Sequence, residues 1–210
     1  MCCCSRRVTR LLWRWRFYGV APPLDEEWAE VVAHARRHFP HASLSFADLH
    51  VAFAEAAIGD DDALQRRIAE LQGLARDGRL SSGEVAPILC AATAALGRGD
   101  NLEATRVLEA ALVDLPRIGG SHAQREIFED ALIVAYLRSG QFSPGESLLR
   151  ARLVRRPSAR DAECFELCSG NWTDGCCVGR AGSGRLRIGP AFDGRAKSQK
   201  NSPAGRPKCR

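Results

Sequence analysis

The sequence predicts an all-α fold, an α-solenoid of antiparallel helical hairpins followed by a disordered C-terminal tail. Three observations support this prediction. Between residues 21 and 160, apolar residues recur at intervals of three and four, the period of a helix that buries one face. Residues typical of helix starts and ends separate these runs. No segment alternates as a β-strand does over a useful length.

Four helices are expected in the first part of this region. Each has its apolar residues on one face and is bounded by residues that start or stop helices. Pro40 ends the first helix, and Gly59 and Gly78 end the next two. Pro87 is compatible with the beginning of the fourth, because a helix tolerates proline in its first turn. The expected ranges are 25–37, 46–58, 61–77 and from just after Ser82 to Leu96.

Three more helices follow. Asp100 caps the fifth, which ends before Pro116. The string Ser121-x-x-Gln124 is a capping box that opens the sixth. The seventh starts near Ser143 and runs to the next proline. Their apolar residues keep the helical period, so each of these helices is expected to pack one face inward.

The turns between helices repeat at a nearly constant spacing. Gly59, Gly99 and Gly140 begin three similar turns, 40 and 41 residues apart, so each unit is one hairpin. The middle unit meets every spacing of the tetratricopeptide pattern, in which a small residue lets two helices approach and a large apolar one fills the groove between hairpins. Arg152 stands where the last unit should have alanine. The residues expected to pack the repeats are Gly99, Ala104, Leu108, Ala111, Pro116, Tyr136, Gly140 and Leu149.

Charge divides the chain into three segments. Residues 1–20 have five arginines and no acid, residues 21–160 have a net charge of −4, and residues 161–210 have +4, which together give +5. We therefore expect a basic N-terminal segment, a helical-repeat domain and a low-complexity, Cys/Gly/Arg-rich disordered tail with these boundaries. The acidic middle argues against nucleic acid as a partner of the folded part.

Membrane and secreted classes are also disfavoured. No apolar run reaches the roughly eighteen residues of a membrane span. The nine cysteines lie mostly near the two ends rather than through the core, which is typical of unpaired thiols in a reducing compartment, so we expect a cytoplasmic protein. A weaker alternative is peripheral membrane attachment through an acylated Cys2–Cys4 run beside Arg6 and Arg7.

Two candidate sites have a functional and a structural interpretation. The Gly119–Gly120–Ser121 turn opens a helix, and its backbone N–H groups could bind an anion beside Arg117 and Arg125. The same string suits a tight turn with a capping box between Ser121 and Gln124, and we favour this interpretation because no Walker lysine is present. His50 could act as a base, but Asp48 points away from it on a helix, which favours a hydrogen-bonded structural histidine.

Metal and cofactor sites are not expected. His34 and His38 have the spacing of two helical ligands but lack a glutamate or cysteine to complete a site. The four cysteines between Cys164 and Cys177 lack paired Cys-x-x-Cys knuckles. We therefore predict no metal and no cofactor.

Two strings resemble a known family. Residues 117–125 resemble a characteristic stretch of the tetratricopeptide repeat protein 38 family. Residues 12–20, then Trp28, then Phe46-Ala47-Asp48-Leu49-His50, are similar to an upstream part of that family, where the last string usually reads Phe-Asn-Asp-Ala-His. The resemblance covers about residues 12–157. It implies a tetratricopeptide-type α-solenoid without an established catalytic role, as the C-terminal portion of a longer protein.

These features predict a non-catalytic helical-repeat protein that binds a protein or peptide in the groove between its hairpins. The alternative is an enzyme on the same scaffold, with His50 and the Arg117–Arg125 turn in its site.

Overall fold

The computed structural model describes residues 9, 12–14, 16–18, 25–170, 180, 181, 185 and 186. Apart from one pair of two-residue strands, the regular structure of these residues is helical. The elements are α2 (Asp25–His38), α3 (Ser45–Ala57), α4 (Asp61–Arg76), α5 (Val85–Arg98), α6 (Asn101–Leu112), the 3-10 helix η1 (Leu115–Ile118), α7 (His122–Ser139), α8 (Phe142–Arg155), α9 (Ala159–Ser169), β1 (Arg180–Ala181) and β2 (Arg185–Leu186). The two strands pair antiparallel, with Arg180 opposite Leu186. The predicted all-α class is confirmed for this part of the chain.

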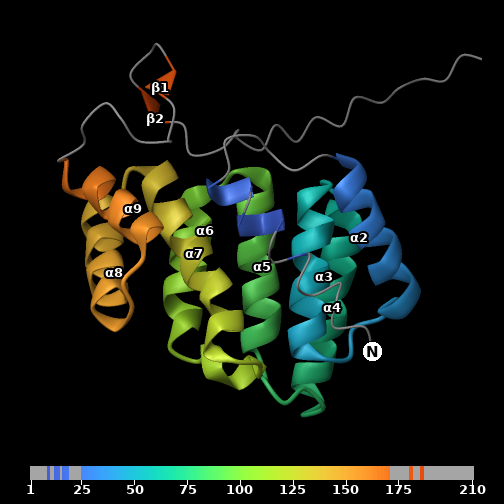
Figure 1. Cartoon of the computed structure of the whole chain (residues 1–210). Helices are drawn as coiled ribbons and strands as arrows, with labels where there is room; N and C mark the ends of the chain where they lie inside the picture. The colour runs from blue at the N-terminus through green and yellow to red at the C-terminus, as the bar shows by residue number, and fades with distance from the viewer. Residues whose placement is uncertain are drawn as a thin grey trace, which may run out of the picture.

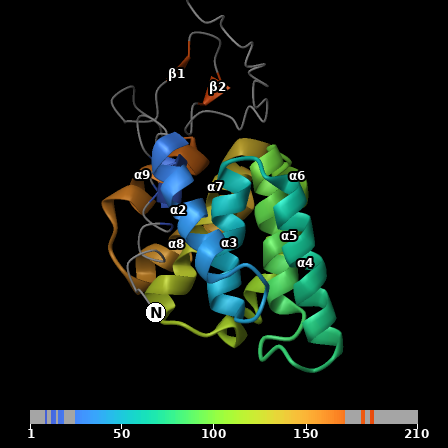
Figure 2. The same cartoon turned by 90° about the vertical axis from the view of Figure 1, so that its right-hand side faces the viewer.

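The helices lie side by side in a row that runs from α2 to α8 and α9 (Figure 1). Consecutive helices contact one another from α2 to α9, with η1 between α6 and α7, and α3 also packs against α5. Turned by 90°, the row has α4, α5 and α6 on one side and α2 and α9 on the other (Figure 2). No described helix is long and apolar enough to cross a lipid bilayer.

Capping residues set the helix ends close to where the sequence predicts them. Asp60 and Asp100 accept hydrogen bonds from the third backbone N–H of α4 and α6, both at 3.1 Å. Ser121 and Gln124 form the predicted capping box at the start of α7. Gly99 and Gly140 end α5 and α7 in the left-handed conformation that glycine adopts without strain.

Most residues expected to pack the repeats are buried. Pro116 is exposed instead: α6 ends at Leu112, before this proline, and Pro116 lies in the first turn of η1. Gly99 and Gly140 lie at the turns of their hairpins, where they cap α5 and α7. The buried members are Ala104, Leu108, Ala111, Tyr136 and Leu149.

The helical region extends beyond residue 160, the expected end of the repeat domain. Ser158 caps α9 by accepting a hydrogen bond from the backbone N–H of Asp161, and α9 buries Cys164 and Leu167. Residues 161–169, the first nine of the expected tail, are therefore helical and pack against α8. For these residues the prediction of disorder is wrong, and the rest of the tail, from residue 171 on, lies outside the described part apart from β1 and β2.

The core also begins before residue 21, the expected start of the repeat domain. Residues 9, 12–14 and 16–18 have helical backbone and form what we call the N-terminal segment, dark blue at the centre of Figure 1. Leu12, Trp13 and Phe17 are only 4%, 2% and 1% exposed. The basic N-terminal stretch therefore contributes apolar side chains to the same core as the helices that follow.

Candidate functional site

The N-terminal segment contacts three helices that are distant from it in sequence. Its side chains contact α3, α7 and α9, and we call the surface that these helices present to it the α3/α7/α9 face. The segment contacts this face through two sets of residues, one aromatic and one charged.

The aromatic set packs against α3. Trp13 and Phe17 are one helical turn apart, with ring centroids separated by 5.0 Å. The Trp13 ring lies 5.0 Å from that of Phe53, and its indole N–H donates to the Phe53 carbonyl oxygen at 2.8 Å. Phe53 in turn contacts Phe128 of α7, with ring centroids 5.4 Å apart. Trp13 is therefore buried with its only polar atom satisfied.

The charged set contacts α7 and α9. Arg14 Nε donates to Asp130 Oδ2 at 2.8 Å, and the Tyr18 hydroxyl donates to the Asp130 carbonyl oxygen at 3.4 Å. The Arg160 guanidinium lies 4.5 Å from the centre of the Tyr18 ring, a cation–π contact. Burial, with a further contribution from Asp130, raises the pKa of Tyr18 well above its ordinary value. The hydroxyl is therefore a neutral donor at physiological pH.

Arg14 belongs to a buried charge cluster. Asp130 is fully buried and also pairs with Arg152 Nη1 at 2.9 Å and Arg160 Nη2 at 3.0 Å. Asp161, 3% exposed, pairs with Arg152 Nε at 3.0 Å and Arg160 Nη2 at 2.9 Å. We call these residues the Asp130 cluster. Each carboxylate has at least two guanidinium partners, which offsets the large cost of removing a charge from water.

Arg152 links the helices of this cluster. It extends from α8 to Asp130 of α7 and Asp161 of α9 with its side chain 3% exposed. Burial alone would lower the pKa of Arg152, but Asp130 and Asp161 hold that pKa above its ordinary value. Arg152 is the residue that replaces the expected alanine of the repeat, and the departure from the pattern thus coincides with the charged contact between α7, α8 and α9.

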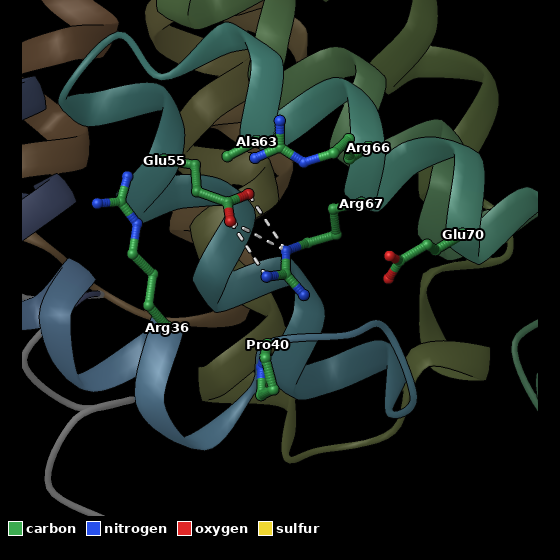
Figure 3. Close-up of a pocket in the computed structure, with 7 residues that line it drawn as sticks. All are labelled: Arg36, Pro40, Glu55, Ala63, Arg66, Arg67 and Glu70. Atoms are coloured by element: carbon green, nitrogen blue, oxygen red, sulfur yellow. Dashed lines mark hydrogen bonds and ion pairs between the residues drawn. The ribbon is translucent and has the colours of Figure 1, made fainter.

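A second buried charge group lies beside a cavity of about 230 Å³ (Figure 3). Arg67 of α4 donates to Asp48 at 2.7 Å and to Glu55 at 3.1 Å, both from α3. Burial raises the pKa of both acids, although Arg67 opposes the rise. Asp48 also accepts hydrogen bonds from the backbone N–H groups of Ser43 and Leu44, ahead of α3. These contacts join α3 to α4 and to the preceding loop.

Four of the charged side chains that line this cavity, those of Arg36, Glu55, Arg67 and Glu70, make internal contacts. Besides Arg67, Arg36 pairs with Asp60, and Glu70 accepts a hydrogen bond from the backbone N–H of Ala42. Arg67 also donates to the carbonyl oxygen of Phe39. The remaining lining residues are Pro40, Ala63 and Arg66. The arrangement is explained by packing between α2, α3 and α4.

His50 is buried rather than presented to a substrate. It is 5% exposed, and its Nδ1 lies 2.7 Å from the Phe46 carbonyl oxygen. Its ring contacts that of Phe46 at a tilt of 58°, with centroids 4.6 Å apart. Gly120 packs against the Phe46 ring, so close that a Cβ there would lie 2.8 Å from Phe46 Cε2. The structure thus places the predicted turn near His50, with Phe46 in contact with both.

The other residues of that turn make local contacts. Ser121 and Gln124 are engaged in the capping box, and Arg125 donates to the carbonyl oxygen of Gly120. The Arg117 guanidinium lies against Gly83. None of these four residues belongs to the α3/α7/α9 face as defined above.

The thiols and histidines considered as ligands form no metal site among the described residues. Within the part that the structure describes, no three His, Cys, Asp or Glu side chains are placed to hold a metal ion. The rings of His34 and His38 contact each other at a tilt of 42°, with centroids 4.3 Å apart. Cys164 and Cys168 are free thiols, and burial raises their pKa values to about 12 and about 11. Cys176 and Cys177 lie outside the described residues.

The α3/α7/α9 face was not among the predicted sites. Two signals in the sequence point to it: Arg152 in an alanine position, and aromatic residues alternating with arginine over residues 13–17. The pairing of Arg14 with Asp130 could not be predicted from a sequence pattern. The residues around Arg14 and those around Asp130 show no feature that indicates a contact between them.

No protein-family model matches this sequence. No solved structure matches it either.

Proposed function

We propose that this chain is a tetratricopeptide-type α-solenoid, the C-terminal portion of a protein of the tetratricopeptide repeat protein 38 family, which binds a protein or peptide and catalyses no reaction. Helices α3–α8 are its three hairpins. The free thiols Cys90, Cys164 and Cys168 are consistent with a reducing compartment, and we place the protein in the cytoplasm.

Repeat spacing and packing support the solenoid. The turns at Gly59, Gly99 and Gly140 are 40 and 41 residues apart, and each joins two helices that contact each other. Ala104 and Leu108, at the small and large positions of the tetratricopeptide pattern, are 0% and 1% exposed. A buried small residue at that position allows two helices to approach closely.

One observation supports binding above all: the α3/α7/α9 face already holds a helical stretch of chain. It does so with a buried indole hydrogen bond at Trp13 and an ion pair at Arg14, the kinds of contact that anchor interfaces. Helical-repeat proteins use extended faces of this kind to hold peptides and other proteins. No observation favours the enzymatic alternative, since His50 is buried and its Nδ1 bonds to backbone.

Site-specific photo-crosslinking tests this proposal. A crosslinking side chain replaces Ala57, at the end of α3, whose carbonyl oxygen accepts from Arg16. The matched control replaces Leu102, which is 66% exposed on α6. In cell lysate we expect a defined protein to be captured through position 57 and not through position 102. Capture of nothing at position 57, or of the same proteins at both positions, would contradict binding through this face.

A further inference from the structure

We propose that the α3/α7/α9 face recognises an amphipathic helix by a pattern of aromatic, arginine, aromatic and aromatic residues at positions i, i+1, i+4 and i+5. The N-terminal segment is the chain's own copy of this pattern, and a partner helix that has the pattern displaces it. This inference rests on the proposed function and specifies the partner of the same face.

The pattern follows from how the segment is held. Trp13 and Phe17 occupy i and i+4, the same side of a helix, and both are buried against the aromatic core. Arg14 and Tyr18 occupy i+1 and i+5, the adjacent side, and both contact Asp130. A helix that presents these four side chains satisfies two neighbouring subsites at once.

The charged subsite requires an arginine in particular. Asp130 is fully buried, and without Arg14 one of its oxygens, Oδ2, loses the guanidinium that reaches it. A planar guanidinium reaches such an oxygen with a directed N–H donor, whereas an apolar residue would leave it buried and unsatisfied. The face therefore discriminates against helices that have the aromatic residues without the arginine.

The aromatic subsite requires a tryptophan at position i. The indole N–H of Trp13 reaches the carbonyl oxygen of Phe53 at 2.8 Å while its ring contacts Phe17, Trp28 and Phe53. Phenylalanine would fill part of the space and leave this contact unmade. The partner is thus an aromatic, basic helix rather than an acidic or purely aliphatic one.

The internal copy competes with any partner. A tethered segment acts at an effective concentration in the millimolar range, so a partner binds the intact chain more weakly than it binds the vacated face. Weakening the segment without altering the face should therefore increase affinity for a helix added in trans.

A fluorescent peptide of residues 9–20 tests the proposal by anisotropy with the full-length chain. We expect it to bind the W13A/F17A chain about tenfold more tightly than the wild-type chain, because the competitor is weakened. Adding D130N to that chain, and R14A to the peptide, should each weaken binding about tenfold. The peptide change for comparison is R16A. Arg16 Nη1 donates to the neutral carbonyl oxygen of Ala57 at 3.4 Å and its guanidinium lies 5.8 Å from the centre of the Trp13 ring, both longer contacts than that of Arg14 with a buried carboxylate, so R16A should have a smaller effect.

Three results would overturn the proposal. Equal affinity of the peptide for the wild-type and W13A/F17A chains would show that the segment does not compete. Equal losses of affinity for the R14A and R16A peptides would show that the face does not recognise the arginine at position i+1. If W13A/F17A does not fold, R14A in the chain keeps the aromatic residues and should still increase peptide affinity. A dimer of the wild-type chain in sedimentation would make a second copy the occupant.

The crosslinking and peptide experiments separate the two proposals. Capture of a protein through position 57 without binding of the peptide would contradict recognition of the residue pattern and would still support the proposed function. Binding of the peptide without capture of any protein would contradict the proposed function. The α3/α7/α9 face would then serve only the intramolecular contact with the N-terminal segment.

Discussion

Arg14 Nε lies 2.8 Å from Asp130 Oδ2, although 116 positions separate the two residues. Arg14 is in the basic stretch that precedes the expected repeat domain, and Asp130 is in the middle of α7. The pair attaches the start of the chain to the second half of the helical row. It also makes the N-terminal segment part of the fold, although the segment differs from the helical region in its basic composition.

Replacing Arg14 by alanine should lower the free energy of unfolding by about 1–2 kcal/mol. Asp130 would remain buried with Arg152 and Arg160 but would lose its third guanidinium partner. Urea denaturation measures the loss. Arg16→Ala is the control, and an equal loss in that variant would contradict a specific role for Arg14.

Replacing Arg152 by alanine should be more damaging, by about 3–5 kcal/mol, because two buried carboxylates lose a partner together. The exposed Arg150 of the same helix pairs with Glu146, and Arg150→Ala should cost less than about 1 kcal/mol. In a double-mutant cycle with Asp161→Asn we expect coupling of about 1 kcal/mol or more. Strict additivity would show that the contact with Asp161 does not stabilise the protein.

Gly120→Ala should destabilise the protein more than Gly140→Ala. Both glycines have φ of +75°, so both variants lose about 1–2 kcal/mol to backbone strain. A Cβ at position 140 meets nothing within 4 Å, whereas one at position 120 lies 2.8 Å from Phe46 Cε2. Thermal unfolding compares the two. Equal losses would mean that the turn does not pack on Phe46.

Stability should decline in alkaline solution partly because of Cys164. Burial raises its pKa to about 12 from an ordinary value of 9.0, so the folded state keeps the thiol protonated where the unfolded state ionises it. The stabilisation is present in full below pH 9 and is lost as the pH rises from 9 to 12. Urea unfolding at pH 8 and pH 10.5 should show a smaller decline for Cys164→Ala than for the wild-type chain. An unchanged decline would contradict the burial of this thiol.

The helices could be predicted because their signals are local. The apolar period, the capping box at Ser121 and the glycine stops at Gly99 and Gly140 each act within a few residues. α9 was missed because its pattern is short and lies in a glycine-rich, cysteine-rich context. Pro116 was expected to pack a repeat, but α6 ends four residues earlier and leaves it to begin η1.

The face and its charge cluster could not be predicted, for a different physical reason. Asp130, Arg152 and Asp161 are ordinary charged residues in helical sequence, and nothing local shows that they are buried together. Arg152 is the exception, because it occupies a position where the repeat pattern has a small residue. The contact of Trp13 with Phe53 joins residues 40 positions apart, and its existence depends on the tertiary arrangement.

Hydrogen exchange of the full-length wild-type chain tests the central claim most directly. The amides of residues 12–18 should be protected in the free chain, and an excess of the residue 9–20 peptide should make them exchange faster while α3 stays protected. This result would show a face that holds a helix and exchanges it for another. Lack of protection in the free chain, or protection that the peptide does not change, would contradict the account.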